Sequence, residues 1–324
     1  MPSAMTAAFG SGFCSALMYL SVLTGSFGGM ILVYLAPLPL FLAGLAYGTP
    51  AVLVAGITAV VLVVGLSGSL VLPLALLGFA VVPVVVVVRQ GLLSRPVAGS
   101  GAEGSIPAVE WYPPGRLLVI LTGIGGVALV AALVLTLGSD GGLQGVVQHL
   151  LAVTLNEVLL PSAGESGSGF EPAALLIAEI FPGAVITSWL LMVVINGLLA
   201  QGVLSHFGRM IRPALSMAEL ELPHWMPLVF ALSVLGAVLV RDQVGYALVN
   251  LSLIQAVPFF FAGLGVVHAF ARYRRAKVGI LVMFYLILSV FAWPVLVVVG
   301  LGIIEQWARL RRRFAADGPD QGEA

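Results

Sequence analysis

Long apolar runs separated by short polar turns make up most of this 324-residue chain. A helix needs about 20 apolar residues to cross a bilayer, and runs of about that length recur along the whole sequence. We predict spans at residues 9–23, 28–47, 51–66, 70–88, 117–137, within 172–207, and at 227–240, 244–271 and 278–304. The predicted fold class is an all-α, polytopic transmembrane helical bundle of about eight or nine spans.

Changes in this pattern suggest a domain organisation. The first four runs are joined by very short turns, which predicts an amino-terminal four-helix membrane unit at residues 1–88. Residues 89–116 are rich in Gly, Ser, Pro and Arg, and we interpret them as a basic cytoplasmic linker. Residues 117–313 would form a carboxy-terminal membrane bundle, and residues 314–324 a disordered tail.

Residues 140–160 differ from the spans on either side. Apolar residues from Leu143 to Leu159 recur at three- and four-residue spacing, with Gln, His, Asn and Glu between them. This pattern predicts an amphipathic helix in the loop after the fifth span. Such a helix would lie flat at the membrane interface or cap a cavity.

Composition supports the membrane interpretation. Hydrophobic residues account for 60% of the chain and charged residues for 9%, and the mean hydropathy is +1.13. Soluble domains contain roughly 25% charged residues, so a soluble enzyme, a secreted disulfide scaffold and a disordered chain are excluded. The 14 Lys and Arg residues balance the 14 Asp and Glu residues, and no overall charge indicates nucleic acid as a partner.

Basic loops predict which ends of the spans face the cytoplasm. The Arg residues of the 89–116 segment indicate a cytoplasmic amino terminus in a multi-pass membrane protein. The last span conflicts with this count, because one helix at 278–304 would carry the basic cluster 309–313 outside. Either Pro294 breaks this segment in two, or the short segment 227–240 does not span, or the helix is merely kinked and the rule fails.

Motifs for soluble chemistry do not occur in the sequence. It has no phosphate-binding loop, no zinc-protease motif and no nucleophile elbow, and its four His residues and single Cys lack ligand spacing. We therefore expect no enzymatic activity, no catalytic residue, no metal and no cofactor. Any transport would depend on a partner protein for energy.

Polar residues inside apolar spans are the candidate functional residues, because hydrocarbon penalises them. Glu179 lies three residues before Pro182, and a proline-broken helix beside a carboxylate can build a polar cavity. The alternative is that the span begins near Pro182 and leaves Glu179 among the headgroups. Asn196 and Asn250 are further candidate ligand contacts, and interhelical hydrogen bonding is the alternative role for both.

The segment Pro37-Leu38-Pro39 predicts a second break, in the second span. Two prolines remove two backbone donors, and free carbonyls at membrane depth are tolerated where they line a cavity or are buried in protein. We therefore include Pro37, Pro39 and Phe41 among the candidate ligand-binding residues. The alternative is a plain kink beside a surface turn.

Three features together carry a family resemblance: the stretch from Tyr34 to Phe41, the basic loop after the fourth span, and the set Gly302, Glu305, Trp307 and Arg311. With them the chain resembles the YybS-like family of bacterial membrane proteins of unknown function. Its amino-terminal part is distantly similar to the substrate-binding subunits of energy-coupling-factor vitamin transporters. That similarity implies a compact helical bundle that holds a small molecule and borrows ATPases from partners.

Two functional hypotheses follow. In the first, the protein is a small-molecule binding or transport component without its own ATPase. A small apolar ligand would lie near Pro37–Phe41, with Glu179 and Asn250 as polar contacts. In the second, the protein is a membrane scaffold or assembly factor. Its basic segments 272–277 and 309–313 would then recruit protein partners or membrane lipid.

Overall fold

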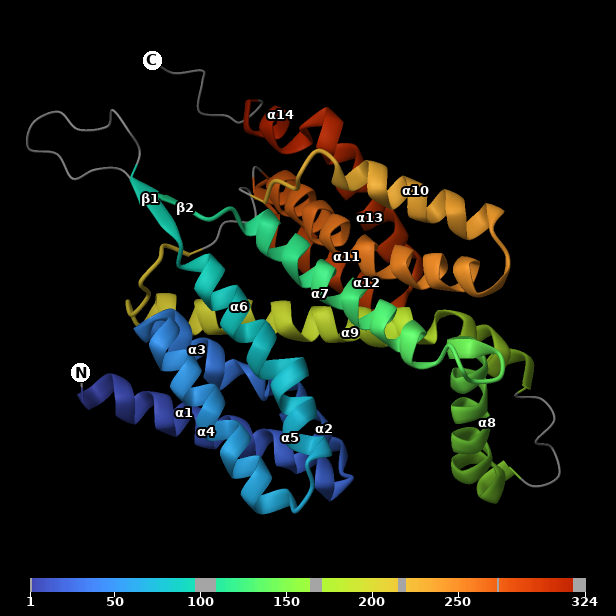
Figure 1. Cartoon of the computed structure of the whole chain (residues 1–324). Coiled ribbons are helices and arrows are strands. Elements are labelled where there is room, and N and C mark those ends of the chain that lie inside the picture. The colour runs from blue at the N-terminus through green and yellow to red at the C-terminus, as the bar shows by residue number, and fades with distance from the viewer. Residues whose placement is uncertain (1, 97–108, 164–170, 215–219, 273, 317–324) are drawn as a thin grey trace, which may run out of the picture. The chain divides into compact units, whose positions relative to one another are not determined.

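Helices account for almost all of the structure, a computed structural model that describes residues 2–96, 109–163, 171–214, 220–272 and 274–316 (Figure 1). The predicted all-α fold class is confirmed. In chain order the elements are α1 (Pro2–Leu20), η1 (Ser21–Thr24), α2 (Phe27–Leu35), α3 (Pro37–Tyr47), α4 (Thr49–Ser67), α5 (Val71–Leu76), η2 (Leu77–Val81), α6 (Val82–Gly91), β1 (Ser94–Pro96), β2 (Val109–Trp111), α7 (Pro114–Leu135), α8 (Gly142–Ala163), α9 (Glu171–His206), α10 (Met226–Leu239), α11 (Asp242–Arg272), α12 (Lys277–Val290), α13 (Trp293–Ala308) and α14 (Leu310–Ala316).

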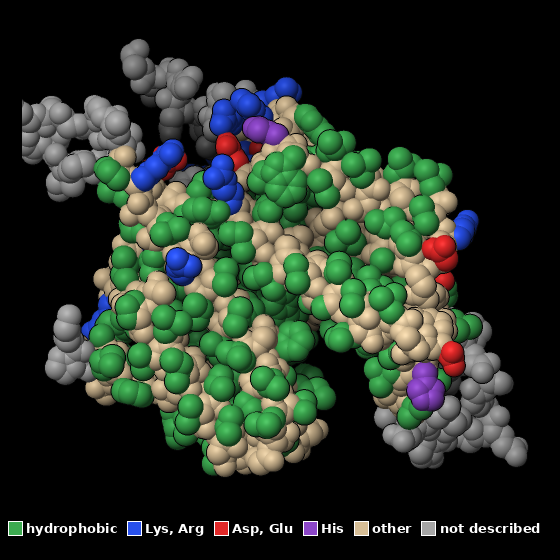
Figure 2. Space-filling view, in the orientation of Figure 1, with side chains coloured by type: hydrophobic (Ala, Val, Ile, Leu, Met, Phe, Trp, Pro, Cys, Tyr) green, Lys and Arg blue, Asp and Glu red, His purple; other side chains and the backbone are tan. Residues whose placement is uncertain are grey.

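Among the described residues, 7 helical stretches are long and apolar enough to cross a membrane. They are Ser3–Thr24, Phe27–Tyr47, Thr49–Ser67, Val71–Gly91, Pro114–Leu135, Leu175–His206 and Asp242–Arg272. Three apolar helices, α10, α12 and α13, are shorter. Large apolar side chains cover much of the surface in Figure 2, and Lys and Arg side chains occupy small areas of it. A surface of this kind is suited to lipid.

Local sequence signals explain where many helices begin and end. Ser26 caps α2, its hydroxyl accepting a hydrogen bond from the Gly29 N–H at 3.1 Å. Proline stands in the first turn of α4, α10 and α13, where a missing N–H costs little. It also stands in the first turn of α3 and α6, which directly follow other helical residues. Gly48 (φ 90°) and Gly68 (φ 63°) adopt left-handed backbone conformations at the two ends of α4.

The chain divides into two compact units. Unit 1 comprises Met1–Leu117 and Trp189–Glu219, and unit 2 comprises Leu118–Ser188 and Leu220–Ala324. This division differs from the predicted one, which assigned all of residues 117–313 to a carboxy-terminal bundle. The carboxy-terminal half of α9 instead groups with the amino-terminal helices, because its side chains bond to η2 and α2, as described below.

Close packing in unit 1 depends on small residues. Helix α1 contacts α3 and α4, and α3 contacts α4 and α6. A Cβ atom on Gly44 of α3 would lie 2.8 Å from the methyl groups of Val88 in α6, and one on Gly56 of α4 would lie 2.5 Å from Val81. The helices therefore approach more closely than alanine would allow.

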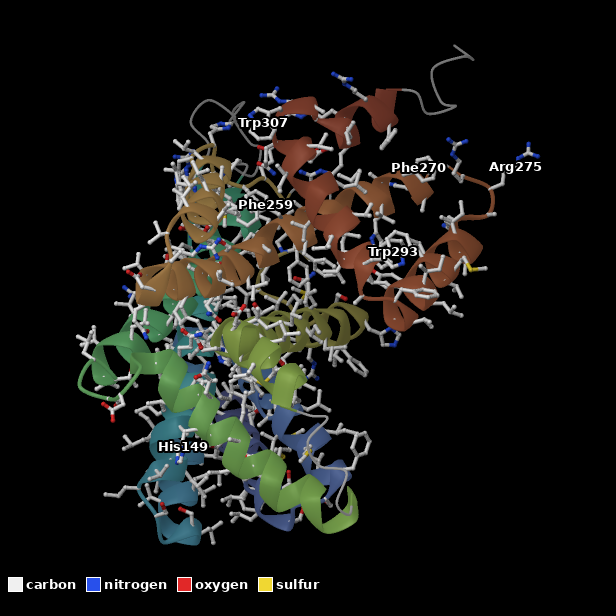
Figure 3. The ribbon with its side chains drawn as sticks, turned by 90° about the vertical axis from the view of Figure 1, so that its right-hand side faces the viewer. His149, Phe259, Phe270, Arg275, Trp293 and Trp307 are labelled. Carbon is white, nitrogen blue, oxygen red and sulfur yellow. The ribbon has the colours of Figure 1, made fainter. Side chains whose placement is uncertain are left out.

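Unit 2 is organised around α11, which contacts α8, α10, α12, α13 and α14. Gly263 of α11 packs against Val298 of α13, and Gly302 of α13 packs against Phe259 of α11. Residue numbers rise in opposite directions along this contact, so α11 and α13 are antiparallel. Figure 3 labels Phe259 on α11 and Trp293 and Trp307 on α13.

The predicted ninth span is two helices. Helix α12 ends at Val290, Phe291 is extended (φ −116°, ψ 140°), and α13 begins at Trp293. The prediction of a single helix at 278–304 is therefore wrong, and its alternative, a break at Pro294, agrees with the structure. The physical reason is that Pro294 cannot donate a helical hydrogen bond and favours the first turn of a new helix.

The predicted linker at residues 89–116 contains a β-hairpin. Strands β1 and β2 pair antiparallel, with Ser94 opposite Trp111 and Arg95 opposite Glu110. The Tyr112 N–H donates to the Leu93 carbonyl at 3.0 Å and extends this pairing towards the helices. The linker is thus ordered at both ends, whereas its residues 97–108 lie outside the described residues.

The remaining two predicted segments have different outcomes. The amphipathic segment at 140–160 is helical and belongs to α8, whose Leu143 and Val147 are buried while Leu150 is exposed. The predicted disordered tail at 314–324 is wrong in its first residues, because α14 continues to Ala316. The rest of that tail lies outside the described residues.

Candidate functional site

Pro182 lies inside α9, which continues through it as one helix, and the side chain of Asn250 from α11 bonds to the α9 backbone on both sides of this proline. In a regular helix the Gly183 N–H would donate to the Glu179 carbonyl, four residues earlier. The Gly183 N–H donates to Asn250 Oδ1 at 2.7 Å, and Asn250 Nδ2 donates to the Glu179 carbonyl at 2.9 Å. One carboxamide of α11 therefore bonds to both backbone groups of this turn of α9.

A second side chain of α11 satisfies the carbonyl that Pro182 leaves without its donor. Proline has no N–H, so the carbonyl of Ala178, four residues earlier, loses its helical partner. The Tyr246 hydroxyl donates to this carbonyl at 3.0 Å. Tyr246 precedes Asn250 by one turn, and its own carbonyl accepts a hydrogen bond from Asn250 Nδ2 at 2.8 Å. One face of α11 therefore bonds to the α9 backbone on both sides of Pro182.

The Asn250 side chain is closely packed between α9 and α11. Asn250 is 0% exposed, and a Cβ atom on Gly183 would lie 2.8 Å from the Asn250 carbonyl oxygen. Its amide group donates both protons to backbone carbonyls and accepts from a backbone N–H. The interhelical role considered from the sequence is therefore present, and direct ligand contact by Asn250 stays a prediction.

The Glu179 carbonyl accepts the hydrogen bond from Asn250, while the Glu179 side chain is exposed. Helix α9 begins at Glu171, so Glu179 lies inside the helix and not at its start. Its neighbours Leu176 and Ile180 are exposed apolar residues. Within the part of the chain that the structure describes, the Glu179 carboxylate makes no hydrogen bond or ion pair. A carboxylate in apolar surroundings favours a polar or cationic partner.

Asn196 has a similar role in unit 1, at the break between α2 and α3. Its Nδ2 donates to the carbonyl of Tyr34 at 2.7 Å and to that of Met192 in its own helix at 2.8 Å. The Ser15 hydroxyl donates to the carbonyl of Ala36 at 2.7 Å. Side chains from α9 and α1 therefore satisfy the carbonyls just before Pro37.

The space behind the two prolines is filled by protein. Phe41 is 1% exposed, and its ring lies 3.5 Å from the position of a Cβ atom on Gly197. Pro37 is buried and Pro39 is half-buried. The structure places these candidate residues in a packed interior, and a ligand role for Pro37, Pro39 and Phe41 stays a prediction.

The backbone at a third proline is satisfied in the same way. Pro83 leaves the carbonyl of Phe79 without a helical donor, and η2 is a π-helical turn at this point. The indole Nε1 of Trp189 donates to this carbonyl at 2.7 Å. The sequence did not point to Tyr246, Trp189 or Ser15. For Tyr246 and Trp189 a partial signal was present, since a proline marks the carbonyl four residues earlier as needing a donor. No proline marks the Ala36 carbonyl to which Ser15 donates.

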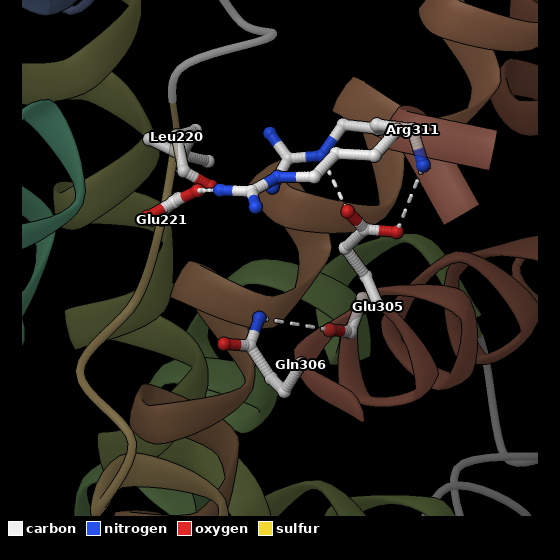
Figure 4. Close-up of polar contacts among 7 residues, drawn as sticks. Leu220, Glu221, Glu305, Gln306 and Arg311 are labelled. Atoms are coloured by element: carbon white, nitrogen blue, oxygen red, sulfur yellow. Dashed lines mark hydrogen bonds and ion pairs between the residues drawn. The ribbon is translucent and has the colours of Figure 1, made fainter. Parts of the chain in front are cut away.

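A buried ion pair closes the carboxyl end of unit 2 (Figure 4). Arg311 Nε lies 2.8 Å from Glu305 Oε1, and the two side chains are 9% and 5% exposed. The Arg311 N–H donates to Glu305 Oε2 at 3.3 Å, and Arg311 Nη2 donates to the carbonyl of Leu220 at 2.8 Å. Between α13 and α14, Arg309 adopts a left-handed backbone conformation (φ 48°), and Arg311 lies in the first turn of α14. Glu305 and Arg311 therefore fix the start of α14 beside the segment that leads into α10.

Three buried polar atoms have no hydrogen-bond partner among the described residues: Thr187 Oγ1, Asn196 Oδ1 and Gln255 Oε1. Gln255 is 8% exposed and lies in α11. A buried acceptor without a donor costs about 1–3 kcal/mol. In the same described part of the chain, no three His, Cys, Asp or Glu side chains are grouped as metal ligands.

Comparison with known proteins agrees with this architecture. Residues 164–305 match the family model described as Predicted membrane protein (DUF2232). The matched region is less than half of the chain and includes Glu179, Pro182, Asn250, Gly302 and Glu305. No curated protein and no solved structure matches the chain. Together with the helices described above, the match supports a multi-pass, all-α membrane protein whose function is not established.

Proposed function

We propose that the protein is a membrane-embedded binding or transport component for a small, mostly apolar molecule, and that Glu179 contacts the polar part of that molecule. The supporting observation is the exposed Glu179 carboxylate, which has no hydrogen-bond or ion-pair partner among the described residues and lies on an apolar helix three residues before Pro182. Exposing a charge to hydrocarbon costs about 2.5–3.5 kcal/mol on insertion scales. A ligand carrying an amine or another hydrogen-bond donor would offset this cost.

The backbone around the prolines supports the same proposal. Helices with irregular backbone at membrane depth are typical of proteins that bind and move small solutes. Here α2 and α3 are separated at Ala36, η2 is a π-helical turn before Pro83, and α9 contains Pro182; single side chains bond to carbonyls near each proline. The buried Gln255 Oε1 offers a further acceptor in unit 2. Asn250 then acts as a positioning residue that fixes the Glu179 backbone.

The wider biological setting is part of the proposal. The protein would lie in the bacterial inner membrane with a cytoplasmic amino terminus, as its basic segments indicate. Its resemblance to the YybS-like family, and its distant similarity to the substrate-binding subunits of energy-coupling-factor transporters, fit a binding component that depends on a partner for energy.

Ligand-induced stabilisation of the full chain tests this function. The protein in nanodiscs would be heated with a panel of hydrophobic amines and with neutral alcohols of matched size. We expect amines to stabilise it more than their neutral counterparts, and Glu179→Gln to weaken binding by about tenfold or more. Glu221→Gln is the matched control, because the Glu221 carboxylate lies in an exposed ion pair with Arg312.

Two results would count against the proposal. One is equal stabilisation by amines and alcohols, which would indicate that the Glu179 carboxylate contacts lipid headgroups and not the ligand. The other is an equal loss of binding in Glu179→Gln and Glu221→Gln. If no compound stabilises the protein and one partner copurifies in stoichiometric amount, the scaffold hypothesis replaces the transport hypothesis. The exposed Arg312 and Trp307 near the buried pair would then be the first surface to examine.

A further inference from the structure

A pocket of about 300 Å³ lies where the β-hairpin meets the start of α7, and it is separate from the Glu179 region. Arg95, Glu110, Trp111, Tyr112 and Arg116 are among its lining residues. All of them belong to unit 1. The volume is at the lower end of the range for small-molecule sites, which is large enough for a phosphate group with its immediate substituents.

The position of the pocket along the chain places it at the membrane boundary. The hairpin connects the candidate spans Val71–Gly91 and Pro114–Leu135, so it begins where one apolar helix ends and finishes where the next one starts. Trp111 and Tyr112 are residue types enriched at the interface between hydrocarbon and water. A ligand in this pocket would therefore meet the headgroup layer.

Charges in the pocket favour an anion. Arg95 Nη2 lies 2.7 Å from Glu110 Oε2, and both side chains are exposed. Glu110 therefore compensates Arg95. Among the described residues no carboxylate pairs with Arg116, which leaves one uncompensated guanidinium in the pocket. Guanidinium groups bind phosphate with two parallel hydrogen bonds.

The wall formed by Trp111 is held in place from within the unit. The Arg212 guanidinium carbon lies 5.9 Å from the centre of the Trp111 ring, and Arg212 Nη1 donates to the Gly91 carbonyl at 2.9 Å. Arg212 is 9% exposed, so this contact lies behind the ring and away from solvent. Trp111 and Tyr112 thus give the pocket aromatic walls, and Arg116 gives it a guanidinium that no described carboxylate pairs with.

We propose that this pocket binds the phosphate of an anionic phospholipid headgroup, with Arg116 as the principal contact. The phosphodiester would lie against Arg116, while the acyl chains would extend along the apolar surface of the adjoining spans. Trp111 and Tyr112 would border the glycerol region. This site does not depend on the function proposed for Glu179.

Lipid binding to the full-length protein tests the proposal. Protein in zwitterionic detergent would be titrated with phosphatidylglycerol and with phosphatidylcholine, and bound lipid would be counted by native mass spectrometry. We expect phosphatidylglycerol to bind more tightly, and Arg116→Gln to weaken it by about tenfold, the scale of one charge-assisted hydrogen bond. Arg275→Gln is the control, because Arg275 is an exposed basic residue in the turn before α12 (Figure 3).

A second variant, with the opposite expected effect, keeps the test informative if Arg116→Gln binds weakly because it misfolds. Glu110→Gln removes the carboxylate that compensates Arg95, so two guanidinium groups become available and phosphatidylglycerol should bind more tightly than to the unchanged protein. Equal weakening by Arg116→Gln and Arg275→Gln would overturn the proposal. So would the absence of tighter binding in Glu110→Gln. If inorganic phosphate binds as tightly as phosphatidylglycerol, the proposed lipid ligand is wrong and the pocket binds a soluble anion.

Discussion

At the scale of single residues, prolines and glycines determine this structure in opposite ways. Pro83 and Pro182 each free a carbonyl, and an aromatic side chain from another helix donates to it. Gly263 and Gly302 have no side-chain carbon, so α11 and α13 can meet there backbone to backbone. The residues with the smallest side chains therefore set the helix separation, and those without an N–H decide where polar side chains are needed.

Gly302 gives the sharpest test at this scale. A Cβ atom there would overlap the Phe259 carbonyl oxygen, whereas one on Gly300, in the same helix, meets nothing within 4 Å. We expect Gly302→Ala to lower the free energy of unfolding by about 2 kcal/mol or more through overpacking. Gly300→Ala should be neutral or slightly stabilising, because alanine favours helix.

Unfolding in mixed micelles, followed by circular dichroism, would measure both changes. Equal stability of the two variants would show that α13 shifts freely along α11, against the close packing described for unit 2.

At the scale of elements, apolar runs in the sequence were enough to locate most helices. The spans up to residue 88 and the segment at 117–137 correspond closely to structural helices. The apolar pattern predicted α12 and α13 as one helix, because a single proline permits either a kink or a break. The hairpin strands were not predicted, because they have three residues each and depend on pairing between residues as far apart in sequence as Arg95 and Glu110.

The candidate site was predictable only in part, for a related reason. Glu179, Pro182 and Asn250 were singled out separately as polar or helix-breaking residues. Their meeting depends on a hydrogen bond across 71 residues of sequence, and no local pattern specifies it. The ion pair of Glu305 with Arg311 is closer in sequence, but it requires the left-handed turn at Arg309. Arginine adopts that conformation rarely.

The hydrogen bonding around Pro182 in α9 can be tested by a double-mutant cycle. Tyr246→Phe removes the donor to the Ala178 carbonyl and should cost about 1 kcal/mol of unfolding free energy. In a Pro182→Ala background the restored N–H at position 182 can satisfy that carbonyl, so Tyr246→Phe should cost clearly less.

Tyr285→Phe is the control for this cycle, because the Tyr285 hydroxyl lies 3.4 Å from His268 and contacts no proline-freed carbonyl. Its cost should be the same in both backgrounds. An unchanged cost of Tyr246→Phe in the Pro182→Ala protein would contradict this role of Tyr246.

At the scale of the whole molecule, unit 2 bears on the conflict in the sidedness count. Gln243, at the start of α11, bonds to the Gly141 carbonyl, so the turn after α7 and the α10–α11 turn lie at one end of this unit. Arg312 pairs with Glu221, before α10, at 2.9 Å. Helix α10 lies between Glu221 and the α10–α11 turn. The carboxy-terminal basic cluster is therefore expected on the face opposite to Asp140.

Single-cysteine labelling in intact cells and inverted vesicles measures this arrangement. The natural Cys14 is exposed and would first be replaced by serine. In that background we expect Asp140→Cys and Arg241→Cys to react from the outside, and Glu221→Cys and Arg312→Cys only from the cytoplasmic side. Labelling of Arg312→Cys from the same side as Asp140→Cys would show that the positive-inside assignment fails at the carboxyl end.

The pairing of prolines with distant donors has an evolutionary consequence. While Pro182 is present, selection should hold position 246 to a side chain that can donate a hydrogen bond, and Pro83 should constrain position 189 in the same way. In descendants that have lost either proline, the corresponding aromatic residue becomes free to drift to phenylalanine or leucine. Substitutions at 182 and 246, and at 83 and 189, are therefore expected to accumulate as correlated pairs across divergent lineages.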